Sequence, residues 1–220
     1  MQLLTHHDPD WELEFESLAF TVEALLAHPE PDDQELGRLA ARTTAVLADW
    51  EEIDADGRGL GRNALHAAAR VRAADIALDH ALGVFAEDVL QAAGGDRASA
   101  LYERFFPEPH EDLLEMGLDA SLPVVMLGAL ALEQDSTLPE ALRAHGATLK
   151  DAVALGNGAL AERAESFADL GRHQARVEAW KETAAATHRN LRRTLGRLAA
   201  ARGLPERWAS GFFLDGRGAS

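Results

Sequence analysis

The feature that most constrains the fold is a run of residues, 62–92, in which apolar side chains recur every three or four positions. Because an α-helix turns once in about 3.6 residues, this spacing places the apolar side chains on one helix face. The positions are Leu65, Ala68, Ala69, Val71, Ala74, Leu78, Leu82, Phe85, Val89 and Leu90. A helix with such a face needs other helices to cover it.

The rest of the chain supplies those helices. Ala and Leu prevail and aromatic residues make up 6% of the chain, so the enrichment typical of strands is missing. Helical periodicity predicts further helices over 10–28, 32–54, 110–132, 137–170 and 172–201. Glycine-rich segments at 56–61 and 94–95 and the prolines around residue 107 are predicted to separate them, and Pro123 is expected to kink or divide the helix over 110–132. The predicted fold is all-α, an antiparallel helical bundle of about six long helices.

The order of these elements suggests two similar three-helix halves. Leu-Gly-Arg at 60–62 precedes the Phe-Phe pair at 105–106, much as Leu-Gly-Arg at 170–172 precedes Phe-Phe at 212–213. Such short matches are common in a sequence rich in Ala, Leu, Gly and Arg, so duplication is a hypothesis. The domain prediction is an N-terminal half, 1–107, a C-terminal half, 108–215, packed on it as one compact unit, and a flexible tail, 216–220. Each Phe-Phe pair is expected to seal one end of a bundle.

Charge is distributed unevenly along the chain. The formal net charge is −16, and a pI near 4.9 argues against a nucleic-acid or anionic-membrane binder. Within 171–207, however, nine basic residues accompany three acidic ones. The basic segment is expected to complement the acidic N-terminal half, either within one molecule or across a dimer. The residues predicted to form an interaction surface are Arg189, Arg192, Arg193 and Arg197.

Several classes of protein are unexpected for this sequence. It contains no Cys, which excludes disulfides and thiolate metal sites within the chain and fits a reducing compartment. No signal peptide is expected, and the most apolar window, 122–132, is too short to cross a bilayer. A cytoplasmic location is therefore predicted.

No motif predicts a catalytic residue, a metal ligand or a cofactor. None of the nine histidines follows an acidic residue by three positions, and the His-x-x-x-His pattern is absent. Asp75 and Asp79 lie one helical turn apart, but such pairs more often face solvent or meet arginines. The segment 52–63 differs from a calcium-binding loop at the positions where the sequence pattern of that loop is strictest. The glycine-rich segment 57–62 is not preceded by the strand that a phosphate-binding loop requires.

Two functions from different classes remain. The first is a non-enzymatic interaction or assembly module that binds a protein partner or a second copy of itself. The alternative is a helical bundle that binds a small apolar ligand near the Pro123 kink, where proline and glycines open space in the packing. Its predicted ligand-binding residues are Leu122, Val125, Met126 and Gly156.

Overall fold

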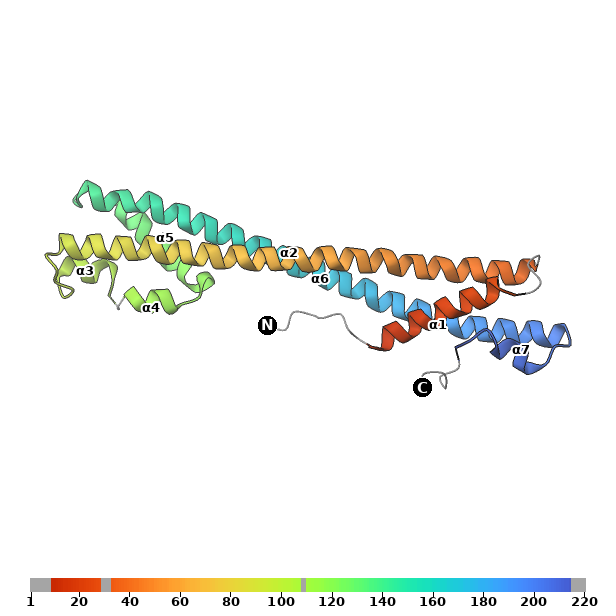
Figure 1. Cartoon of the computed structure of the whole chain (residues 1–220). Coiled ribbons are helices and arrows are strands. Elements are labelled where there is room, and N and C mark those ends of the chain that lie inside the picture. Colours follow the sequence, from red (N-terminus) through yellow and green to blue (C-terminus); the bar gives the residue numbers. More distant parts are fainter. Residues whose placement is uncertain (1–8, 29–32, 108–109, 215–220) are drawn as a thin grey trace. The chain divides into compact units, whose positions relative to one another are not determined.

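A computed structural model describes residues 9–28, 33–107 and 110–214, and these residues form helices and connecting turns without a strand. The predicted all-α fold is confirmed (Figure 1). The helices are α1 (Pro9–Leu26), α2 (Gln34–Ala92), α3 (Ala100–Phe105), α4 (His110–Glu115), α5 (Leu118–Gln134), α6 (Glu140–Ala201) and α7 (Glu206–Ser210). None of them combines the length and the apolar character required to span a bilayer. The predicted tail 216–220 lies outside the described residues.

Two predicted helix breaks were wrong. The helices expected over 32–54 and 62–92 are one helix of 59 residues, α2, and those expected over 137–170 and 172–201 are one helix of 62 residues, α6. Glycine within a helix costs only about 1 kcal/mol relative to alanine, so packing of the flanking turns outweighs it. The predicted stop at Gly94–Gly95 is confirmed, because both glycines adopt the positive φ that ends a helix, and Gly203 does the same after α6.

The predicted effect of Pro123 also needs correction. The helix expected over 110–132 is divided at Met116–Gly117, where Gly117 precedes the first residue of α5, and Pro123 lies inside α5. A proline in the second turn removes one backbone hydrogen bond close to the start of the helix, where the first N–H groups have no partner within the helix in any case. The division therefore follows the glycine rather than the proline.

The chain forms two compact units, which we describe separately. Unit 1 comprises 1–59 and 171–220, and unit 2 comprises 60–170. The units differ from the expected halves 1–107 and 108–215, because α2 and α6 each contribute to both units. In α2 the division falls just before the Leu-Gly-Arg tripeptide 60–62, and in α6 it falls within the tripeptide 170–172.

Unit 1 contains α1, the first part of α2, the last part of α6, and α7. Trp50 and Trp180 pack with their ring centroids 4.5 Å apart and their planes tilted by 42°, and the indole Nε1 of Trp180 donates a hydrogen bond to the carbonyl of Val46 at 2.8 Å. At Gly57 a Cβ atom would lie 2.6 Å from Nε2 of the buried His173. The core around these contacts includes Leu18, Leu25, Leu36, Ala40, Ile53, Val177, Leu191, Leu195, Phe212 and Phe213.

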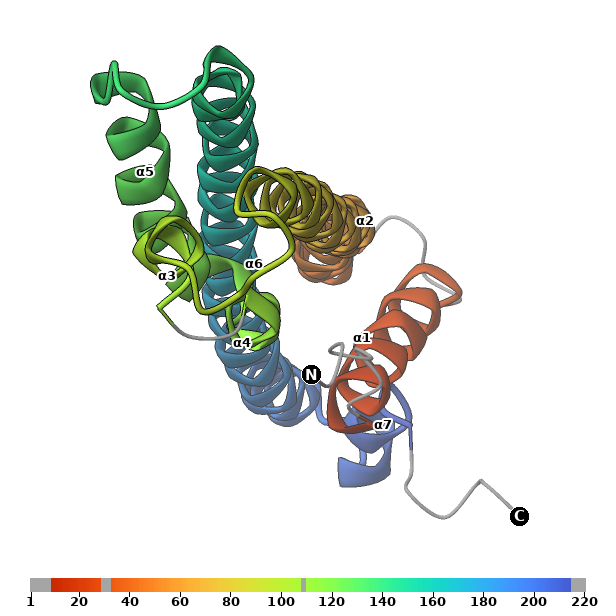
Figure 2. The ribbon, with the colours of Figure 1, turned by 90° about the vertical axis from the view of Figure 1, so that its left-hand side faces the viewer.

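Unit 2 contains α3, α4 and α5 with the remaining parts of α2 and α6. Figure 2 shows α5 lying beside the first part of α6. Glycines allow this approach: a Cβ at Gly146 would lie 3.0 Å from the carbonyl oxygen of Ala129. The core includes Ala74, Leu78, Leu82, Phe85, Val89, Tyr102, Phe106, Leu132, Leu149 and Val153. Phe106 is buried in this unit as Phe212 and Phe213 are in the other, so both Phe-Phe segments contribute to a core.

Substitution of Gly57 and of Gly59 by alanine should change the stability of the protein differently. Gly59→Ala is expected to raise the free energy of unfolding by up to about 1 kcal/mol, because nothing lies within 4 Å of the new Cβ and alanine favours the helix. Gly57→Ala should lose this gain, since the new methyl group displaces the buried His173 ring. Urea denaturation of both variants measures the difference. Equal stabilisation would show that His173 moves aside without cost.

Candidate functional site

The four arginines predicted to form an interaction surface are all exposed on α6, within unit 1. Arg193 donates a hydrogen bond to Oδ1 of Asn190 at 2.6 Å, and Arg197 donates one to Oγ1 of Thr194 at 3.4 Å. The guanidinium of Arg192 lies 4.3 Å from the ring centroid of Phe213, a cation–π distance. None of the ion pairs among the described residues involves Arg189, Arg192, Arg193 or Arg197.

Other basic residues of the same segment pair with α2 inside unit 1. Arg202 forms ion pairs with Asp33 and with Glu35, and Arg176 pairs with Asp56 at 2.7 Å. The complementarity expected between the acidic and basic segments thus operates within one molecule at these positions. It leaves the carboxylate-binding capacity of Arg193 and Arg197 unused.

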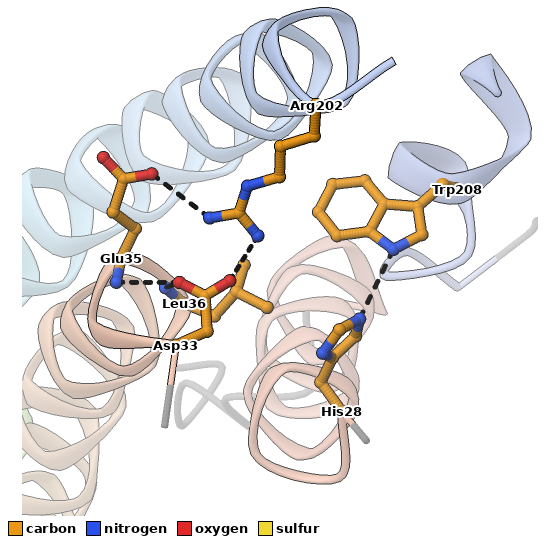
Figure 3. A network of polar contacts seen from close by, with 6 residues as sticks. All are labelled: His28, Asp33, Glu35, Leu36, Arg202 and Trp208. Atoms are coloured by element: carbon orange, nitrogen blue, oxygen red, sulfur yellow. Dashed lines mark hydrogen bonds and ion pairs between the residues drawn. The ribbon is translucent and has the colours of Figure 1, made fainter. Parts of the chain in front are cut away.

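Asp33 also caps the start of α2 (Figure 3). Its Oδ1 accepts hydrogen bonds from the backbone N–H groups of Glu35 at 3.0 Å and Leu36 at 3.3 Å. The hydrogen bond from Arg202, together with these backbone bonds, lowers the pKa of Asp33 from 3.8 to about 2. The same close-up shows the indole of Trp208 directed at His28, with 3.4 Å between Nε1 and Nε2.

A groove lies between α2 and α6 beside the predicted arginines, with a cavity volume of about 280 Å³. Leu39 and Leu191 provide its apolar part, and Arg42 adds a positive charge from α2. Arg193 and Arg197 are hydrogen-bonded to two of its lining residues. The other lining residues are small or polar: Thr43, Thr183, Ala186, Thr187, Asn190 and Thr194. The groove therefore suits a ligand surface that is partly apolar and carries negative charge.

The outward face of α5 in unit 2 is a second unusual surface. Leu127 is 69% exposed and Val124 is 44% exposed, and Pro123 and Ala120 are exposed beside them. The opposite face of α5 is buried through Leu118, Leu122, Val125, Ala129 and Leu132. Residues 120–132 include no charged side chain, so α5 is apolar on both faces. Helices of this kind are usually covered on both faces.

The residues predicted to bind an apolar ligand are brought together by direct packing. Leu122 and Val125 are buried in the core of unit 2, and Met126 packs against that core. A Cβ at Gly156 would lie 2.7 Å from Cδ2 of Leu122 and 3.3 Å from Cδ1 of Leu118. Side chains of α5 thus occupy the space that Gly156 opens on α6.

The structure also forms polar pairs that no sequence motif indicated. Nε2 of His145 lies 2.7 Å from Oδ2 of Asp88 in unit 2, and Oγ of Ser17 lies 3.3 Å from Nε2 of His188 in unit 1. Burial, and then the charge of Arg192, lowers the pKa of His188. These partners are 57 and 171 residues apart in sequence, so local spacing gives no signal for them. Each pair joins two helices.

The acidic residues that the sequence analysis considered as possible sites lie within the long helix α2. Asp75 pairs with Arg72 at 2.7 Å, and the pKa of Asp79 is raised by burial and by the neighbouring Asp75. Residues 52–63 lie within α2, so their backbone cannot wrap a calcium ion. No cluster of three or more metal-ligating side chains occurs in the part of the chain that the structure describes.

Comparisons with protein-family models, with curated proteins and with solved structures find no match for this chain. The functional argument therefore depends on the surfaces described above.

Substitution of two neighbouring glycines distinguishes close packing at Gly156 from open space. Gly156→Ala is expected to lower the free energy of unfolding by about 1–3 kcal/mol, because the new methyl group would overlap Leu122. Gly158→Ala is the matched control and should be neutral or stabilising, since nothing lies within 4 Å of its Cβ. Thermal denaturation measures both. A stable Gly156→Ala variant would indicate that room for a ligand exists there.

The interaction of Asp33 with Arg202 should make stability depend on pH. Because the pKa of Asp33 is about 2 in the folded protein and ordinarily 3.8, its contribution is present above pH 3.8 and disappears as the pH falls toward 2. Asp33→Asn retains a capping side chain but removes the charge. At pH 7 it should be destabilised by on the order of 1 kcal/mol, since solvent screening weakens the pair.

Urea denaturation of this variant between pH 7 and pH 3 checks the expectation. The difference from the wild type should shrink below about pH 4. Glu35→Gln, which removes an exposed first-turn carboxylate and a 3.4 Å contact of Arg202, serves as the control and should have a smaller effect. A difference that stays constant down to pH 3 would contradict the assignment.

Proposed function

We propose that the protein is a non-enzymatic assembly module that binds a second copy of itself through the outward face of α5. The observation that carries this proposal is the exposure of Leu127 and Val124 on a helix whose opposite face is already buried. Since the described residues of unit 2 leave these side chains exposed, burying them against another molecule would recover about 25 cal/mol per Å² of apolar surface. A cytoplasmic location, expected from the sequence, belongs to the same proposal.

The composition of α5 favours an identical partner. In a two-fold symmetric contact, the same surface meets itself, so an uncharged apolar stripe is self-complementary along its length. Small residues at Ala120, Gly128 and Ala131 allow two helices to approach closely. Glu133, which follows the stripe in sequence, lies against α6 and pairs there with Lys150 of its own chain, so it adds no charge to the outward face.

Charge substitution at the centre of α5 tests the proposal. Wild-type protein at micromolar concentration is expected to be oligomeric by sedimentation velocity. Leu127→Glu should weaken the association through this face at least about tenfold, because it places a charge in an apolar contact. Its folded state should be retained, since Leu127 is already 69% exposed.

Leu155→Glu provides the matched control, because Leu155 is 50% exposed on α6 of the same unit and lies about 100° around the helix axis from Gly156, which meets α5. This variant should associate like the wild type. A monomeric wild-type protein, or equal effects of the two substitutions, would contradict the proposed role of α5.

A further inference from the structure

We infer that the groove between α2 and α6 in unit 1 receives the outer face of α1 from a second copy of the chain. This inference rests on the proposed self-association and adds a contact that is chemically different from the apolar face of α5. Its basis is the match between a groove bordered by arginines and an exposed helix face that combines large apolar side chains with carboxylates.

The groove presents positive charge whose hydrogen bonds go to neutral acceptors. Arg193 and Arg197 bond to the side chains of Asn190 and Thr194, and Arg42 lines the opposite wall. Carboxylates would offer these guanidinium groups an ionised acceptor, which adds an ion pair to the hydrogen bond and allows the bidentate geometry that arginine favours. The groove therefore favours an acidic occupant.

The outer face of α1 has the complementary composition. Leu13 is 61% exposed and Phe20 is 40% exposed, and Glu16 and Glu23 are exposed beside them. Leu13 and Phe20 are separated by seven residues, as are Glu16 and Glu23, so each pair repeats after two helical turns on one side of α1. Apolar side chains thus form a ridge with carboxylates along one edge.

The lengths of the two surfaces also agree. Residues seven apart on a helix are separated by about 10 Å along its axis. The lining residues of α6 extend from Thr183 to Thr194, which corresponds to about 16 Å of helix. Leu13 and Phe20 can therefore both lie within the groove while the carboxylates reach its arginine border.

The α1 helix of the same chain already occupies another side of α6. Ser17 of α1 contacts His188, whereas the groove is lined by Asn190. Residues two positions apart along a helix, such as 188 and 190, are about 200° apart around its axis, so these two residues face different directions. An α1 helix that enters the groove must consequently belong to another molecule.

Charge reversal in the full-length chain tests this inference. We would work with Leu127→Glu protein, so that the α5 contact is removed and association reports the groove alone. The first variant carries Glu16→Arg and Glu23→Arg, and the second carries Arg193→Glu and Arg197→Glu. Every substituted residue is exposed, and thermal denaturation followed by circular dichroism verifies that each variant is folded.

Each variant alone is expected to self-associate at least about tenfold more weakly than its parent in sedimentation velocity, because like charges then meet in the groove. An equimolar mixture should restore association, since the basic α1 of the first variant can enter the acidic groove of the second. The control carries Glu51→Arg and Glu165→Arg, which change the net charge by the same amount as in the first variant. It should associate like its parent. Raising the salt concentration should weaken the parental contact.

Three results would overturn the inference. In the first, both variants associate as strongly as their parent. In the second, the mixture of folded variants does not recover association. In the third, only the variant with Arg193→Glu and Arg197→Glu loses association, which would assign the groove to a different acidic ligand. The proposed function fails separately, through Leu127→Glu in the otherwise wild-type chain. A chain whose association responds to Leu127→Glu but not to charge reversal retains the α5 contact and lacks the groove contact.

Discussion

Burial of one long helix against another is the interaction on which the rest of the structure depends. Neither α2 nor α6, with 59 and 62 residues, could keep its apolar face in water, and each buries that face within both units. Three glycines leave space that side chains of a neighbouring helix occupy. Gly57 makes room for His173 in unit 1, and Gly146 and Gly156 make room for α5 in unit 2. Residues that appear to weaken a helix in isolation are therefore the ones that permit its packing.

The two surfaces to which we assign function arise from incomplete coverage of these helices. In unit 1, α1 packs on one side of the α2–α6 pair and the groove remains on another, with Arg193 and Arg197 beside it. In unit 2, α5 covers the core with one apolar face and leaves a second apolar face exposed. One surface is charged and the other is uncharged, so an assembly that uses both would respond differently to salt at each contact.

Periodicity in the sequence was sufficient to predict the fold class and part of the core, because burial follows the helical repeat. Leu78, Leu82, Phe85 and Val89, all assigned to one face from spacing, are buried, whereas Leu65, assigned to the same face, is 48% exposed. The helix breaks predicted at 56–61 and Gly171 were wrong because glycine has a small local cost, which packing outweighs. Of the candidate sites, exposure of the four arginines on one helix was predictable. The groove was not, since Arg42 and Asn190 meet only through tertiary packing, and the Arg202–Asp33 pair joins residues 169 apart.

The ion pair of Arg202 links the end of α6 to the start of α2 in unit 1. Arg202 directly follows α6, whereas Asp33 and the amides it caps begin α2. When the last turn of α6 frays, Arg202 withdraws and the capping carboxylate loses the cation that holds it in place. Hydrogen exchange at Glu35 and Leu36 is therefore expected to depend on the opening of a segment far away in the sequence. We expect the beginning of α2 and the end of α6 to open together, although each is a helix terminus that would fray independently in a peptide.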